Sequence, residues 1–112
     1  MQLLVVVLNK IEEFDDLLIE LSNNGIRGGT IIDTMGMARA LANDHSEIPL
    51  FGTLRSILNE DRPINKTIFM VLPDAKLPVA INCVRKVVPN INEENMGIMF
   101  TLPVNYVEGL TK

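Results

Sequence analysis

Residues 25–41 read GIRGGTIIDTMGMARAL, and this stretch decides the fold because it joins a helical pattern to an apolar β-branched run. Its glycines match neither the G-x-G-x-x-G fingerprint nor the Gly-Lys-Ser/Thr ending of a phosphate-binding loop. They follow a helical pattern and precede a strand pattern, whereas a phosphate at a helix N-terminus needs the reverse order. We therefore interpret Gly25 as a left-handed helix cap, followed by a turn at Gly28 and Gly29. Residues 30–35 then form a strand.

A strand and an amphipathic helix are predicted before these glycines. Residues 3–8, LLVVVL, form a short continuous apolar run, which is typical of a strand buried on both faces. Apolar residues then recur at helical spacing from Ile11 to Leu21, while acidic residues occupy the other face. Asn9 is the expected N-cap of this helix, and Glu12, three residues later, closes a capping box.

The second half of the chain repeats this order. Residues 66–72, KTIFMVL, form another apolar run and predict a third strand. A second helix opens at Asp74 or Pro78, because proline is tolerated in a first turn, and Pro89 ends it. After a polar turn, residues 97–104, GIMFTLPV, predict the last strand.

The order strand-helix-strand, long segment, strand-helix-strand is the split βαβ pattern. It predicts an α+β, ferredoxin-like βαβ-βαβ sandwich, a four-stranded antiparallel sheet with two helices on one face. The other face is then open, yet LLVVVL and TIFMVL do not alternate apolar and polar residues as an open face requires. Either the long segment folds back over this face or a second copy covers it, and we expect a homo-oligomer.

Length, net charge and cysteine content restrict the classes of protein to which this chain can belong. A chain of 112 residues suffices for one domain with a core, so residues 1–112 are expected to form a single domain. The net charge of −4 supplies no basic field for a nucleic-acid backbone. The single cysteine, Cys83, cannot form an internal disulfide, which suits a reducing compartment. The first apolar run is too short to span a membrane and follows no basic residue as in a secretory signal, so a cytoplasmic protein is expected.

GIRGGTIIDTMGMAR resembles a segment of the PII signal-transduction proteins, the trimeric nitrogen-regulatory family. In that family a strand follows a glycine-rich turn, and a Gly-x-Gly-Arg sequence starts the large T-loop. Here that sequence reads Gly36-Met37-Ala38-Arg39, with alanine at the second glycine. The C-terminal GIMFTLPVNYVEGL resembles the last strand of the family and the turn after it. The resemblance implies a homotrimer that binds a small effector between subunits and regulates a partner, a transporter or an enzyme, through its T-loop.

The family binds adenine nucleotides, and this chain departs from the motifs that do so. The family's B-loop ends Gly-x-Gly-Lys, but here Asn95 replaces a glycine and Ile98 replaces the lysine. The two C-terminal arginines of the family fall where residues 108–111 read EGLT. A triphosphate needs cations to offset its charge, so we expect degraded ATP-binding motifs and no certain cofactor, with an adenine nucleotide as one candidate ligand.

The resemblance places ligand-binding residues at two points of the chain. They are Gly36, Met37, Ala38, Arg39, Gly97 and Ile98. Arg39 is the strongest single candidate, because a guanidinium at a cleft edge suits a carboxylate or phosphate ligand. The alternative is a surface arginine paired with an acidic neighbour.

Residues 37–66 resemble a T-loop-like insertion between strands that should pair, and a loop this long usually has a task. Apolar residues at helical spacing predict a short amphipathic helix over residues 50–59. This helix either docks on a partner protein or packs on its own trimer. The predicted partner-binding residues are Leu50, Phe51, Leu54, Arg55, Ile57 and Leu58.

No catalytic or metal-binding residues are expected. His45 lies beside Asp44 and Glu47 but lacks a second histidine or cysteine ligand. Cys83 falls on the apolar stripe of the second helix, so a buried structural thiol is expected. The alternative to a signalling protein is a CutA-like or other ferredoxin-like trimeric module that binds a small ligand or metal.

Overall fold

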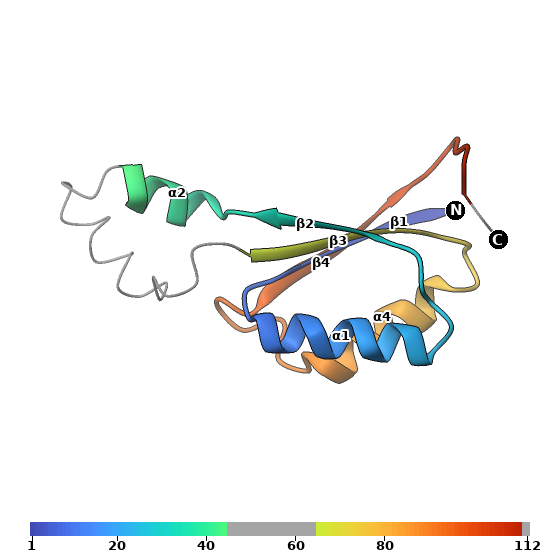
Figure 1. The fold of residues 1–112 in the computed structure, drawn as a ribbon, viewed down its shortest axis with the longest axis horizontal. Coiled ribbons are helices and arrows are strands. Elements are labelled where there is room, and N and C mark those ends of the chain that lie inside the picture. Colours follow the sequence, from blue (N-terminus) through green and yellow to red (C-terminus); the bar gives the residue numbers. More distant parts are fainter. Residues whose placement is uncertain (45–64, 111–112) are drawn as a thin grey trace.

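A four-stranded antiparallel sheet of order β2-β3-β1-β4 organises the chain. The computed structural model describes residues 1–44 and 65–110. The elements are β1 (Gln2–Leu8), α1 (Ile11–Asn23), β2 (Thr30–Thr34), α2 (Met37–Asp44), β3 (Asn65–Leu72), α4 (Leu77–Val87) and β4 (Gly97–Pro103). Helices α1 and α4 lie against the same face of the sheet (Figure 1). The predicted ferredoxin-like α+β fold is confirmed.

The core lies between this face and the two helices. Alternate residues of the two central strands point toward the helices, because Leu4 pairs with Met70 and Val6 with Ile68 in the antiparallel register. All four side chains are buried. The helices contribute buried apolar side chains at helical spacing, namely Phe14, Leu17, Leu21, Ala80, Cys83 and Val84. Each large apolar side chain that is buried here stabilises the fold by about 1.5–3 kcal/mol.

The end of α1 has the predicted glycine cap. Gly25 adopts φ 82°, a conformation that costs glycine little. The N–H of Ile26 donates to the carbonyl of Leu21 at 2.9 Å, and the N–H of Gly25 donates to the carbonyl of Ser22 at 3.1 Å. These two bonds form a Schellman motif, which turns the chain sharply from α1 toward β2.

The start of α1 differs from the prediction. Lys10 is the N-cap residue, and no side chain caps the helix. The side-chain amide of Asn9 instead donates to the carbonyl of Asn95, in the loop before β4. The predicted capping box at Asn9 and Glu12 is therefore wrong, because a bond between two distant loops replaces the local cap.

The segment after β2 begins with a helix that the sequence interpretation treated as loop. Helix α2 follows Gly36, whose carbonyl accepts the N–H of Ala40 at 3.0 Å. Its sequence, MARALAND, includes strong helix formers, so intrinsic helix propensity could have predicted this helix. In Figure 1, α2 lies beyond the end of the sheet, away from α1 and α4. The helix predicted over residues 50–59 lies outside the described residues.

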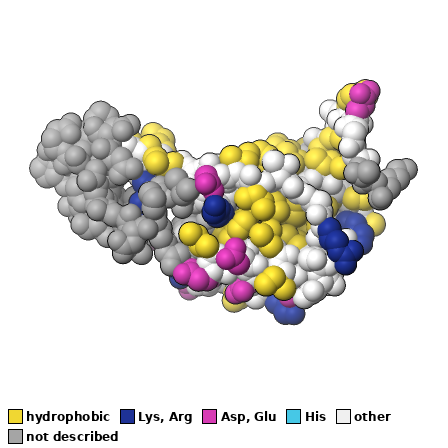
Figure 2. All heavy atoms as spheres, in the orientation of Figure 1, with side chains coloured by type: hydrophobic (Ala, Val, Ile, Leu, Met, Phe, Trp, Pro, Cys, Tyr) yellow, Lys and Arg dark blue, Asp and Glu magenta, His cyan; other side chains and the backbone are white. Residues whose placement is uncertain are grey.

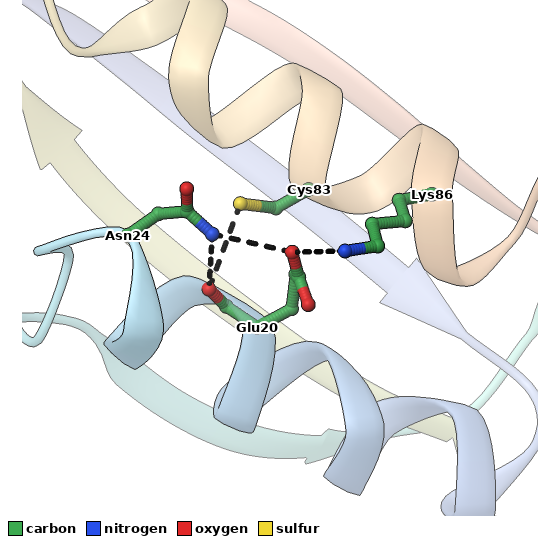
Figure 3. A network of polar contacts seen from close by, with 4 residues as sticks. All are labelled: Glu20, Asn24, Cys83 and Lys86. Carbon is green, nitrogen blue, oxygen red and sulfur yellow. Dashed lines mark hydrogen bonds and ion pairs between the residues drawn. The ribbon is translucent and has the colours of Figure 1, made fainter.

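Cys83 connects the two helices, as Figure 3 shows. Its side chain is 4% exposed, and its Sγ lies 3.8 Å from the carbonyl oxygen of Glu20 on α1. The Glu20 side chain also accepts from Lys86 Nζ at 3.1 Å, and Asn24 donates to both the backbone and the side chain of Glu20. The predicted buried thiol is confirmed.

This environment predicts a pH dependence of stability. Burial raises the pKa of the Cys83 thiol; Glu20 raises it further, and Lys86 opposes the change. The folded chain therefore holds the thiol proton more tightly than the unfolded chain, whose cysteine pKa is about 8.5. Stability from the protonated thiol is complete below that pH and decreases as the pH rises above it.

We therefore expect the free energy of unfolding of the wild type to fall more steeply above about pH 8.5 than that of Cys83→Ala. Urea titrations of both proteins at a series of pH values measure the two slopes. Parallel slopes would show that the thiol does not titrate differently in the folded and unfolded chains.

Candidate functional site

The sheet face away from the helices is apolar and partly exposed in the described part of the chain. We call this surface the open face; the register places on it Leu3, Val5, Val7, Ile32, Phe69, Val71, Ile98, Phe100 and Leu102. Phe100 is 44% exposed and Ile98 is 55% exposed, whereas Val5 is buried between its cross-strand neighbours Phe69 and Phe100. Hydrophobic side chains follow the upper rim of Figure 2, the side of the sheet opposite the helices. Such a patch marks an interaction surface.

The predicted ligand-binding residues lie at one end of the sheet but on its two opposite edges. Leu8 of β1 pairs with Lys66 on one side and with Gly97 on the other, and Lys66 pairs in turn with Asp33 of β2. We call this the Gly97 end. Gly36 follows the edge strand β2, and Gly97 begins the edge strand β4.

The structure therefore does not bring the two groups together within one chain. Strands β3 and β1 lie between the two edges, and four strands at the usual spacing place the edges about 14 Å apart. A ligand that contacts both groups needs the β2 edge of one copy beside the β4 edge of another. Such head-to-tail contacts form a ring when the rotation from one copy to the next closes.

The predicted residues differ in their surroundings. Met37 is 79% exposed, and Arg39 is half-buried in the first turn of α2. Ile98 is exposed and belongs to the open face. Two contacts fasten β2 to β3 at this end: Lys66 Nζ lies 2.5 Å from Asp33 Oδ1, and the hydroxyls of Thr34 and Thr67 lie 2.6 Å apart. These contacts fix the end of β2, from which α2 continues, to the neighbouring strand β3.

The presence of glycine at position 97 is explained by the backbone of the sheet, without a ligand. Its φ is 145°, which side chains rarely adopt, and a Cβ built at this position would lie 2.4 Å from the carbonyl oxygen of Val7. Backbone of β4 thus approaches β1 too closely for any other residue. The pairing of β4 with β1 therefore requires Gly97, whether or not this residue also contacts a ligand.

A larger cavity lies at the opposite end of the sheet, which we call the Thr30 end. Its volume is about 1060 Å³, and its walls come from the α1–β2 linker, the end of β3 and the C-terminal segment. Arg27 belongs to the linker, Thr30 begins β2, Phe69 lies in β3, Lys76 directly precedes α4 and Val107 belongs to the C-terminal segment. The N-terminus of the chain lies at this end in Figure 1, and Lys and Arg side chains lie at the same end in Figure 2.

Sequence reasoning missed this cavity, because it treated Gly28 and Gly29 only as a turn. A smaller cavity of about 280 Å³ lies between α1 and β2 on the helix side, and residues 26–29 line both cavities. A Cβ at Gly29 would lie 2.9 Å from Ile68 Cδ1, so the linker packs directly on β3. One feature of the sequence could have indicated this cavity: a cationic residue, Arg27, stands between glycines directly before a predicted strand.

The remaining predicted sites fall largely outside the described residues. This holds for His45 and for the predicted partner-binding residues Leu50, Phe51, Leu54, Arg55, Ile57 and Leu58. Within residues 1–44 and 65–110, no group of three or more His, Cys, Asp or Glu side chains is placed to hold a metal ion. Among the helices in those two ranges, none has the length and hydropathy needed to cross a membrane.

Comparison with known proteins supports the fold. No protein-family model matches the sequence, and no curated protein sequence matches it. Among solved structures, the chain is similar to the crystal structure of Arabidopsis thaliana PII bound to citrate, with a TM-score of 0.60 and 16% sequence identity. The similarity covers 92% of this chain and 73% of that chain. At this identity it shows that the chain has a PII-like ferredoxin-like fold.

Proposed function

We propose that this chain is a PII-like regulatory protein of the cytoplasm. It assembles as a homotrimer, binds a small effector in the clefts between subunits and regulates a partner protein through residues 37–66. One observation carries the proposal: the two groups of predicted ligand-binding residues lie on opposite edges of one sheet. A cleft between two copies is the arrangement that unites them.

The open face supplies the energy for this assembly. Phe69, Phe100 and Leu102 are each between 37% and 49% exposed in the single chain. Burial of apolar surface contributes about 25 cal/mol per Å², so a shared interior made of such faces stabilises an oligomer strongly. In a ring with the open faces turned inward, each copy presents its β2 edge to one neighbour and its β4 edge to the other. The number three rests on the likeness to PII.

The effector is an anion, and the ordinary nucleotide apparatus is degraded. Ile98 supplies no cation where the family has lysine, so an adenine nucleotide is the weaker candidate. Arg39 supplies a guanidinium at the root of the long segment. The structural neighbour is a PII bound to citrate, which supports a carboxylate-bearing effector here as well.

Signal transfer follows from where the effector binds. Gly36 and Arg39 stand at the junction between β2 and α2, so a ligand that contacts them touches the base of residues 37–66. A ligand with tenfold higher affinity for one arrangement of this segment shifts its equilibrium by about 1.4 kcal/mol. The favoured arrangement then binds or releases the partner.

A thermal-shift screen tests the proposed binding. The panel contains ATP, ADP, AMP, cyclic dinucleotides, 2-oxoglutarate, citrate, bicarbonate and divalent metals. Because a ligand at one hundred times its Kd stabilises the folded state by about 2.7 kcal/mol, we expect one anion at that concentration to raise the Tm by about 10 °C. Arg39→Ala should remove the shift, and Arg85→Ala, an exposed arginine on α4, should retain it. A shift that is the same in both variants, or no shift with any compound, would contradict effector binding at this site.

A further inference from the structure

We propose that Asn24 is a site of spontaneous deamidation, and that the C-terminal cap of α1 controls the rate of this modification. Asn24-Gly25 is the one Asn-Gly pair in the sequence. Asparagine is most reactive before glycine, because glycine has no side chain to shield its backbone nitrogen. The inference goes beyond the proposed function, since it involves neither the open face nor the predicted ligand-binding residues.

The reaction joins the backbone nitrogen of Gly25 to Cγ of the Asn24 side chain. The bond between Cγ and Nδ2 breaks, and Nδ2 leaves as ammonia with the proton of the Gly25 N–H. Water then opens the resulting cyclic imide at either of its carbonyl groups, which gives aspartate or isoaspartate at position 24. No atom is oxidised or reduced, and an uncharged amide is replaced by a negative charge.

The native cap holds both reacting groups in an unreactive arrangement. The N–H of Gly25 donates to the carbonyl oxygen of Ser22 at 3.1 Å, so the attacking nitrogen keeps its proton. Figure 3 shows that the Asn24 amide points toward Glu20, where Nδ2 donates to the backbone carbonyl at 2.8 Å and to the carboxylate at 3.2 Å. The ψ of Asn24 is 18°, which turns the Gly25 nitrogen away from the Asn24 side chain. Ring closure therefore requires the cap to open first.

The stability of the cap, rather than access of water, then limits the reaction. Asn24 is exposed, so water reaches it in the native chain. Helix ends open locally at a lower free energy than the whole chain unfolds. Ile26, whose N–H donates to the carbonyl of Leu21 within the cap, is 6% exposed and packs in the core, so it holds this end of α1 closed.

The product weakens the cap that delayed its formation. A carboxylate at position 24 donates no hydrogen bond, so both bonds from Asn24 to Glu20 are lost. It also places a negative charge beside the Glu20 carboxylate and at the C-terminus of α1, where the helix dipole disfavours anions. Because Glu20 also accepts from Lys86 and contacts Cys83, the change reaches the interface between α1 and α4.

Peptide mass spectrometry on the full chain, incubated in slightly alkaline buffer, measures the modification. In guanidinium chloride we expect Asn24 to convert many times faster than Asn105, an exposed asparagine that precedes tyrosine. Gly25→Ala should slow the conversion of Asn24 in the denatured chain. In the native chain, conversion should be about tenfold slower or more than in denaturant, because the hydrogen bonds of the cap must break first.

A pair of core variants separates opening of the cap from unfolding of the whole chain. Ile26→Ala removes apolar contact at the cap, whereas Val88→Ala removes it at the C-terminal end of α4, whose N-terminal end lies over Gly25. We expect Ile26→Ala to accelerate native deamidation about tenfold or more and Val88→Ala to stay near the wild-type rate. Ile26→Val is the milder variant, with a smaller acceleration, if Ile26→Ala does not fold.

An aspartate variant measures the effect of the product. Asn24→Asp should raise the equilibrium constant of unfolding about tenfold, as urea titration measures it. Asn23→Asp adds the same charge at the last residue of α1 but retains Asn24, so its effect should be smaller.

Any of four results would overturn the inference. Asn24 converts no faster than Asn105 in denaturant, or it converts as fast in the native chain as in the denatured chain. Ile26→Ala and Val88→Ala accelerate native deamidation equally. Asn24→Asp is as stable as Asn23→Asp.

Discussion

A glutamate in place of Phe100 is expected to dissociate the assembly into single folded chains. Phe100 lies in the middle of β4 on the open face, in register with Val5 of the central strand β1. In the proposed assembly this position is buried against another copy, and an unpaired carboxylate there costs several kcal/mol. Every 1.4 kcal/mol is a factor of ten in the dissociation constant, so we expect an increase of about a thousandfold or more.

The same substitution should leave one chain folded. Phe100 is 44% exposed in the single chain and covers part of Val5, so its loss should lower the free energy of unfolding by about 1–2 kcal/mol, which is less than a folded domain usually has. Ile19→Glu is the matched control, because Ile19 is 61% exposed on the outer face of α1, away from the sheet. Sedimentation or light scattering should show single chains for Phe100→Glu and intact oligomers for Ile19→Glu. Equal masses for the two variants would mean that the open face is not the interface.

Gly97→Ala is expected to destabilise the fold by about 2–4 kcal/mol, which is a large effect for one added methyl group. The residue has φ 145°, and the new Cβ would lie 2.4 Å from the carbonyl oxygen of Val7 and 2.9 Å from Leu8 Cδ2. The first of these neighbours is backbone of the central strand β1, which cannot move without breaking its pairing with β3 or β4.

Gly36→Ala provides the contrast. Its Cβ would meet only Asn65 Nδ2, at 3.8 Å, and its φ is not positive. We expect a stability change within about 0.5 kcal/mol, because alanine is tolerated where neither space nor φ requires glycine. Urea denaturation of both variants measures the difference. If Gly97→Ala is as stable as Gly36→Ala, the close approach of β4 to β1 is not a constraint on the fold.

Much of the fold could be predicted from the sequence because it depends on local periodicity. The apolar runs at 3–8 and 66–72 became the central strands β1 and β3, and Gly25 became the left-handed cap. The N-cap at Asn9 was wrong because its amide bonds to Asn95, 86 residues away, and local capping rules do not include such a partner. Helix α2 was missed although its alanines and methionine favour helix, since the resemblance to a T-loop suggested an irregular segment.

For the candidate sites, too, the sequence indicated individual residues but not which distant segments meet. The resemblance identified Gly36 and Gly97 as residues of interest, but only the strand order shows that they lie on opposite edges. The cavity at the Thr30 end could not be predicted, because its walls come from segments as distant as Arg27, Lys76 and Val107. No local pattern indicates that these residues meet; the folding of the sheet brings them together.

The mass of the purified protein in solution tests the central claim, that a second copy covers the open face and completes the effector site. Native mass spectrometry or light scattering at micromolar concentration measures it directly. The account predicts an assembly of about three times the 12.5 kDa mass of one chain. A single species at 12.5 kDa, stable across that concentration range, would contradict it.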